Sequence, residues 1–123
     1  MRSLALLARV ALLAVAGCPI CESNTALAIV SGDQELLPGE QVSLALDSEG
    51  FSAGPMRCRG HWYVEGIEGG NTDVGTVTTC GIYTAPTTAG SRRSVRVEAT
   101  EYALDGCADC CPYGQAALTL AAP

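Results

Sequence analysis

After residue 17, apolar and polar residues alternate in several short segments, and no stretch shows a sustained helical period. In the segment 41–47, for example, Val42, Leu44 and Leu46 fall on one side of an extended chain. A period of two is typical of a β-strand with one face in a core and the other in water. The expected strands are 26–30 with 35–37 after a break, 41–47, 61–65, 74–79, 82–85, 94–102 and 115–120.

Turn-forming residues separate these segments, among them Pro38-Gly39, the glycine-rich stretch 66–71 and Cys80-Gly81. Seven or so short strands with a turn about every 8–12 residues are typical of an antiparallel sandwich. We therefore expect residues 26–123 to form one all-β domain, an immunoglobulin-like antiparallel β-sandwich of about seven strands.

The first 17 residues have the pattern of an export signal. A charged segment with Arg2 and Arg9 covers residues 1–9, and the apolar run 10–17 is too short to span a bilayer. We expect residues 1–17 to be removed as a signal peptide and residues 18–25 to form a short tether. Export would place the mature chain in an oxidising compartment.

The end of this signal has a pattern of its own. The residues Val15-Ala16-Gly17-Cys18 resemble the bacterial lipobox, in which small residues precede a lipidated cysteine. The resemblance implies that Cys18 becomes the mature N-terminus and that its acyl chains anchor the protein to the cell envelope. Pro19 stands where that family's common inner-membrane retention signal has Asp, which favours the outer membrane or the cell surface. An ordinary cleaved signal or a buried hydrophobic helix is the alternative.

The chain has seven cysteines, an odd number. Assigning Cys18 to lipidation leaves six, which permits three disulfides with 15 connectivities. In immunoglobulin strand order, the six fall in loops at one end of the sandwich and just before its first strand. We therefore expect a disulfide-linked pole beside the anchor. The disulfide candidates are Cys21, Cys58, Cys80, Cys107, Cys110 and Cys111.

A family resemblance rests on short motifs within residues 37–120. They are Trp62-x-Val64-x-Gly66, Gly75-x-Val77, Gly81-x-Tyr83-x-Ala85-Pro86 and Val95-x-Val97-x-Ala99. These motifs resemble the bacterial Ig-like (Big-type) domain, a β-sandwich of surface and cell-envelope proteins. The resemblance implies a spacer or adhesion role, with an envelope protein or a polysaccharide as partner and without catalysis. Members usually occur in tandem, whereas this chain has one copy and six cysteines that the family pattern does not require.

The cysteines also permit a different function. Cys58-x-x-His61 and Cys107-x-x-Cys110 have the two-plus-two spacing of a tetrahedral zinc site, and the strand order brings the two pairs to one pole. The adjacent Cys110-Cys111 pair permits a thiol-redox site. A zinc-binding or thiol-redox lipoprotein is therefore the alternative to the structural or binding module.

Few residues offer acid–base catalysis. His61 is the only histidine, and no nucleophile motif accompanies it. We therefore expect His61 to be a surface histidine, and we predict neither an enzyme activity nor a cofactor. The acidic pairs Glu65/Glu68 and Glu98/Glu101 are expected to be solvated. Trp62, on the third strand, is expected in the core.

The charge of the chain further limits the classes of partner that it can bind. The net charge is −6, and removal of the signal with its two arginines lowers it to −8. There is no lysine and no basic face, so a nucleic-acid partner is excluded. Arg92 and Arg93 form the basic cluster expected at the pole opposite the cysteines, and they are the candidates for contact with an anionic partner.

Overall fold

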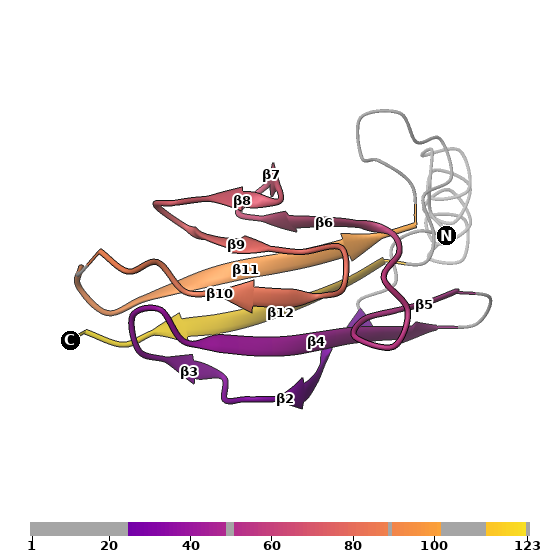
Figure 1. Ribbon diagram of the computed structural model, residues 1–123, viewed down its shortest axis with the longest axis horizontal. Helices are drawn as coiled ribbons and strands as arrows, with labels where there is room; N and C mark the ends of the chain where they lie inside the picture. Colours follow the sequence, from indigo (N-terminus) through magenta and orange to yellow (C-terminus); the bar gives the residue numbers. More distant parts are fainter. Residues whose placement is uncertain (1–24, 49–50, 89, 102–112, 123) are drawn as a thin grey trace, which may run out of the picture.

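The computed structural model describes residues 25–48, 51–88, 90–101 and 113–122. These residues form two six-stranded sheets that face each other as the layers of a sandwich (Figure 1). Over the described residues the fold is all-β, as predicted. The described residues contain no helix that is long and apolar enough to cross a bilayer.

The first sheet is built around two long antiparallel strands, β11 (Arg93–Thr100) and β12 (Tyr113–Leu120), which pair residue by residue along their full length. β6 (His61–Val64) pairs with the other side of β11. The two-residue strand β7 (Ile67–Glu68) extends the sheet beyond β6.

The second sheet has β4 (Gln41–Ser48) at its centre. One side of β4 pairs with β2 (Ala28–Ser31) and the other with β10 (Ile82–Thr84), both antiparallel. The remaining strands are β5 (Phe51–Ala53) beside the end of β4, β9 (Gly75–Val77) beside β10, and β8 (Gly70–Asn71) at the edge.

The first strand of the domain is divided between the two sheets. Its pieces β1 (Thr25–Ala26) and β3 (Glu35–Leu36) pair in parallel with β12, whereas β2 between them pairs with β4. The sheets thus have the orders β2-β4-β10-β9 and β12-β11-β6. These are the orders ABED and GFC of an immunoglobulin sandwich, so the predicted fold is confirmed.

Hydrophobic side chains from both sheets fill the space between the layers. They come from the inward side of the alternating segments, as the period of two predicts. The core includes Val42, Leu44, Leu46, Trp62, Val64, Val95, Val97, Ala99, Leu118 and Leu120.

Burial at the end of β11 differs from the sequence expectation. Glu98 was expected to be solvated, yet it is only 7% exposed, and Thr100 on the same face of β11, opposite the core side chains, is 0% exposed. Glu98 lies between Tyr63 of β6 and Gln115 of β12 in the sheet register. Long side chains on both neighbouring strands therefore cover the outer face of β11 at this end. The alternation of residues along a single strand cannot predict such burial, because it depends on the neighbouring strands.

Tyr83 is the largest of the fully buried side chains, and it joins β10 to the start of β9. Its hydroxyl donates a hydrogen bond to the carbonyl oxygen of Val74, at 2.6 Å. Gly75 has a φ of +97°, and a Cβ there would lie 2.3 Å from the Tyr83 hydroxyl oxygen, so glycine leaves the room for this contact. Burial raises the pKa of Tyr83 to about 12; the positive charge of Arg93 lowers it and the negative charge of Glu65 raises it.

Candidate functional site: the disulfide pole

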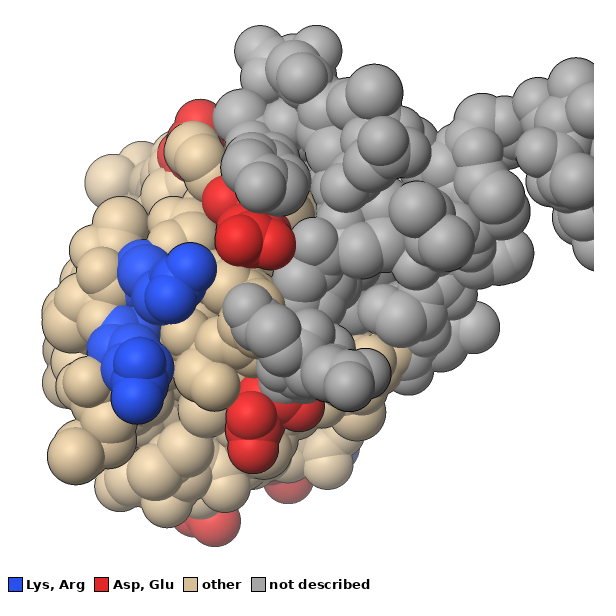
Figure 2. All heavy atoms as spheres, turned by 90° about the vertical axis from the view of Figure 1, so that its right-hand side faces the viewer, with Lys and Arg blue, Asp and Glu red and all other residues tan. Residues whose placement is uncertain are grey.

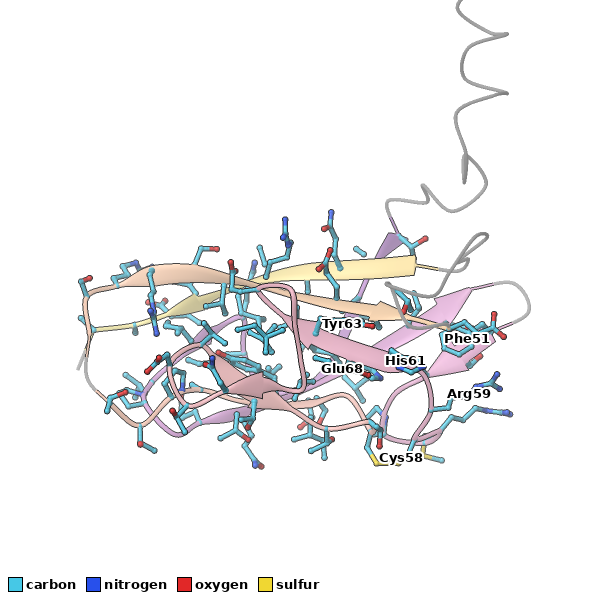
Figure 3. All side chains as sticks on the ribbon, turned by 90° about the horizontal axis from the view of Figure 1, so that it is seen from above. Phe51, Cys58, Arg59, His61, Tyr63 and Glu68 are labelled. Carbon is cyan, nitrogen blue, oxygen red and sulfur yellow. A yellow bond between two sulfur atoms is a disulfide. The ribbon has the colours of Figure 1, made fainter. Side chains whose placement is uncertain are left out.

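Two of the predicted disulfide candidates are joined to each other. Cys58 lies in the loop 54–60 before β6, and Cys80 lies in the turn 78–81 between β9 and β10. A disulfide connects them across 22 residues of sequence (Figure 3). We call this end of the sandwich the disulfide pole. It comprises the loop 54–60, the turn 78–81 and the adjoining ends of β1, β11 and β12.

Local hydrogen bonds shape the turn that carries Cys80. The amide of Cys80 donates to the Thr78 hydroxyl oxygen, at 3.2 Å, and the amide of Gly81 donates to the Thr78 carbonyl oxygen, at 2.9 Å. Gly81 has a φ of +78°, and a Cβ on it would lie 2.3 Å from the carbonyl oxygen of Leu44 and 2.9 Å from Cη2 of Trp62. Glycine at this position therefore allows the turn to pack directly against the tryptophan ring.

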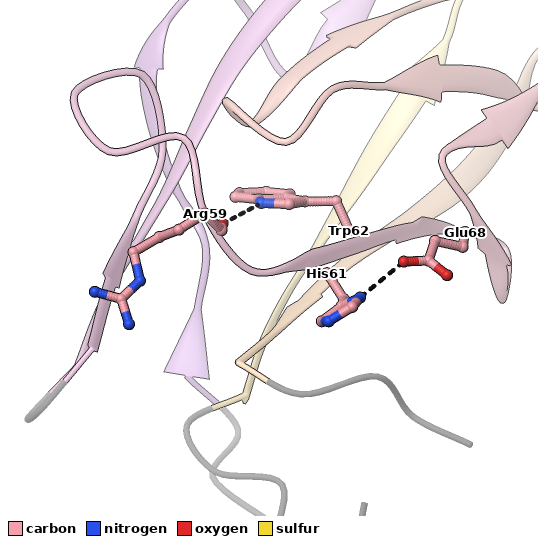
Figure 4. Close-up of polar contacts among 4 residues, drawn as sticks. All are labelled: Arg59, His61, Trp62 and Glu68. Atoms are coloured by element: carbon pink, nitrogen blue, oxygen red, sulfur yellow. Dashed lines mark hydrogen bonds and ion pairs between the residues drawn. The ribbon is translucent and has the colours of Figure 1, made fainter. Parts of the chain in front are cut away.

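Trp62 restrains the other side of the disulfide. Its ring is buried in the core, as expected for a tryptophan on the third strand. Its indole Nε1 donates to the carbonyl oxygen of Arg59, at 3.1 Å (Figure 4). The loop 54–60 is thus held to the core at Arg59 and to the neighbouring turn at Cys58.

His61 lies at the surface, where it contacts a carboxylate. Its Nδ1 lies 2.8 Å from Oε2 of Glu68, a residue of the short strand β7 (Figure 4). The side chain of His61 is 38% exposed and that of Glu68 is 59% exposed. The arrangement is that of a solvated histidine–glutamate pair, in agreement with the expected surface histidine.

The disulfide involves one of the predicted zinc ligands, Cys58. The sulfur of Cys58 is bonded to Cys80, so in this state it has no thiolate to offer a metal. Cys107 and Cys110 lie outside the described residues. Within the described part of the chain, no three His, Cys, Asp or Glu side chains are grouped so that they could hold a metal ion.

The segments that lead to the remaining cysteines reach the sandwich side by side. Thr25 at the start of β1 pairs with Gly114 of β12, and Thr100 at the end of β11 pairs with Tyr113. Thr100 also pairs with His61, directly after the loop that holds Cys58. The cysteines on these segments, Cys18, Cys21, Cys107, Cys110 and Cys111, lie outside the described residues.

The two arginines singled out for an anionic partner both have contacts within the chain. Arg92 is paired with the carboxylate of Glu35, and Arg93 donates a hydrogen bond to the carbonyl oxygen of Asp73. Part of their charge is therefore already balanced. Arg92 nevertheless stays largely exposed, so these residues remain candidates for a binding surface.

The acidic pairs also have local partners. Glu65 accepts a hydrogen bond from the amide of Arg96, and Glu68 contacts His61, as described above. Glu98 lies 3.8 Å from Arg96, and Glu101 lies 3.8 Å from Arg59. Neighbouring hydrogen-bond donors and cations thus account for the places of all four carboxylates.

Comparison with known proteins adds no relative: no family model, no curated protein and no solved structure matches this chain.

Proposed function

We propose that the protein is a lipid-anchored, exported immunoglobulin-like module of the cell envelope that acts by binding or by structure rather than by catalysis. The observation that carries the proposal is the Cys58–Cys80 disulfide at the pole where the chain enters the sandwich. Stable structural disulfides belong to oxidising compartments outside the cytosol, which agrees with export through residues 1–17 and an anchor at Cys18.

The arrangement of the poles supports a spacer or presentation role. Because β1 starts at the disulfide pole, an anchor at Cys18 directs this pole toward the membrane. The opposite pole, with the Pro38-Gly39 turn and the loop that holds Arg92, then points away from it. That end would meet an envelope protein or a polysaccharide.

Fractionation of the full chain in a bacterium that processes lipoproteins tests the anchor. The chain should partition into the detergent phase with the membranes, and Cys18→Ser should shift it to the aqueous phase. Cys21→Ser is the matched control, because it removes a sulfur three residues further along but leaves the Val15–Cys18 motif intact. A Cys18→Ser protein that still partitions with the membranes would contradict the proposal.

The same preparations separate this proposal from the zinc or thiol-redox alternative. Metal analysis and a thiol count under denaturing conditions should find no zinc and no free thiol in the lipidated protein. Stoichiometric zinc, together with free thiols at Cys107 and Cys110, would favour the alternative.

A further inference from the structure

The loop 54–60 combines apolar and basic side chains at the disulfide pole. Met56 at its tip is 94% exposed, and the exposed Arg57 and Arg59 flank Cys58. Figure 3 places Arg59 at the same end of the molecule as Phe51 and Cys58, and Figure 2 shows basic side chains next to one another on that end. No periodicity in the sequence marks Met56, Arg57 or Arg59.

Hydrogen bonds fix the backbone that carries these side chains. The amide of Gly54 donates to the carbonyl of Arg57 and the amide of Arg57 donates to the carbonyl of Gly54, both at 2.9 Å, so Pro55 and Met56 form the tip of a closed turn. The Cys58 disulfide and the Trp62 indole fix the residues that follow. Binding through this tip would therefore require little further ordering of the backbone.

The charge of Arg57 is available to a partner. None of the ion pairs among the described residues includes Arg57. Arg59 lies over the ring of Phe51, with 4.8 Å between the guanidinium carbon and the ring centroid, and 3.8 Å from the carboxylate of Glu101. Arg57 is thus the stronger candidate for contact with an external anion.

Apolar surface continues beside Met56. A hollow of about 240 Å³ lies next to it, and its apolar lining includes Val30, Leu46, Ala53 and Pro55. Among the described residues that line it, the one carboxylate is that of Asp47, which accepts a hydrogen bond from the Ser52 hydroxyl, at 3.2 Å. An apolar surface with an arginine at its rim suits an interface between acyl chains and phosphates.

The position of the chain entry identifies the surface that the loop can reach. Six residues lie between Cys18 and Thr25, so an anchor at Cys18 lies at most about 25 Å from β1 along a fully extended tether of seven residue steps. The disulfide pole is therefore kept close to the membrane. The net negative charge of the chain is repelled by an anionic bilayer, so the orientation that presents Arg57 and Arg59 to it is favoured.

Resting on the proposed anchor, we propose that the loop 54–60 docks on the headgroup layer of anionic phospholipids in the same membrane. Met56 lies at the acyl boundary, and Arg57 lies against the phosphates, assisted by Arg59. The anchor attaches the protein, and this second contact sets the orientation of the sandwich on the membrane.

Tryptophan quenching tests the docked orientation. The lipidated full chain carrying Met56→Trp is reconstituted in vesicles that contain phosphatidylglycerol and lipids brominated in the upper acyl region. Leu37→Trp is the matched control, because Leu37 is an exposed apolar residue next to the turn at the opposite pole, 52% exposed. The native Trp62 is buried in both variants. The expected result is strong quenching at position 56 and weak quenching at position 37.

Charge variants in the Met56→Trp background test the role of the arginines. Arg57→Gln should lower the ratio of docked to undocked protein about fivefold, the equivalent of about 1 kcal/mol for one arginine at an anionic surface. Arg92→Gln removes the same charge at the opposite pole and should leave the ratio unchanged. Vesicles of phosphatidylcholine alone should retain the anchored protein and lose most of the quenching at position 56.

The outcomes separate the two proposals. A lipid-processed chain that fails to sediment with any vesicle would contradict the proposed function. A chain that sediments but shows equal quenching at positions 56 and 37, or equal quenching at position 56 on anionic and neutral vesicles, would overturn the docking surface and leave the anchor in place.

Discussion

Replacement of Tyr83 by Phe tests the buried hydrogen bond that joins β10 to Val74, directly before β9. The substitution removes the hydroxyl that donates to the carbonyl of Val74 and leaves that carbonyl without this donor. The ring stays in place, so the loss is one buried hydrogen bond, and we expect the free energy of unfolding at pH 7 to fall by about 1–2 kcal/mol. Denaturant unfolding followed by the fluorescence of the buried Trp62 measures this change.

The same substitution has a distinct effect at alkaline pH. The folded pKa of Tyr83 is raised to about 12 from an ordinary value of 10.0, so the unfolded chain loses this proton first. The stability that Tyr83 contributes is therefore complete below pH 10 and is lost as the pH rises toward 12. A shift of this size removes about 1.4 kcal/mol from the wild-type protein by pH 11.

The two stability curves should therefore converge as the pH rises. Tyr83→Phe lacks the ionisable hydroxyl, so the difference in unfolding free energy from the wild type should shrink by about 1.4 kcal/mol between pH 9 and pH 11. Absorbance at 295 nm should show that the substitution removes a tyrosine whose pKa in the folded wild type is raised to about 12. Parallel stability curves from pH 9 to pH 11 would refute the assignment of a buried, hydrogen-bonded Tyr83.

Three further experiments with substituted proteins test other parts of the structure by denaturant unfolding. Cys58→Ala with Cys80→Ala opens a 22-residue loop, and the free energy of unfolding should fall by roughly 3 kcal/mol, whereas a loss under 1 kcal/mol would mean that the disulfide does not restrain the unfolded chain. Gly75→Ala should cost about 2–5 kcal/mol from strain and overlap with the Tyr83 hydroxyl, whereas Gly66→Ala, with a similar φ and open space around it, should cost about 1–2 kcal/mol; equal losses would contradict the tight contact at Gly75. Leu118→Ala in the core should cost about 2–5 kcal/mol, and a loss typical of a surface site would contradict its full burial.

The longer strands could be predicted from the sequence because alternation over several residues carries enough information. The segments 41–47 and 115–120 lie within β4 and β12, and the segment 61–65 exceeds β6 by a single residue. Each of them buries one face in the same core, so the local pattern and the tertiary structure agree.

Three of the short strands could not be predicted. β5, β7 and β8 have two or three residues each and lie in stretches expected to be loops or turns. A segment of this length has too few residues to show a period, and its pairing depends on a partner strand that only the folded chain supplies. The same dependence on neighbours explains the burial of Glu98 and Thr100.

The disulfide pole could be predicted in part from the sequence. Strand order alone placed Cys58 and Cys80 in loops at one end of the sandwich, but it left all connectivities open. Their pairing depends on how closely the turn 78–81 approaches the loop 54–60, which the packing of Gly81 against Trp62 determines. The exposed Met56 has no sequence signature, because a single apolar residue in a loop is common on protein surfaces.

We propose above all that the mature protein is a disulfide-linked sandwich anchored through Cys18. The most direct test is the intact mass of the protein isolated from its native membranes without reductant. We expect a chain that begins at Cys18, carries the added mass of acyl groups and lacks six hydrogens, the loss that three disulfides among the proposed six candidates would give. A chain that retains residues 1–17, or a mass with all six of those thiols reduced, would contradict the account.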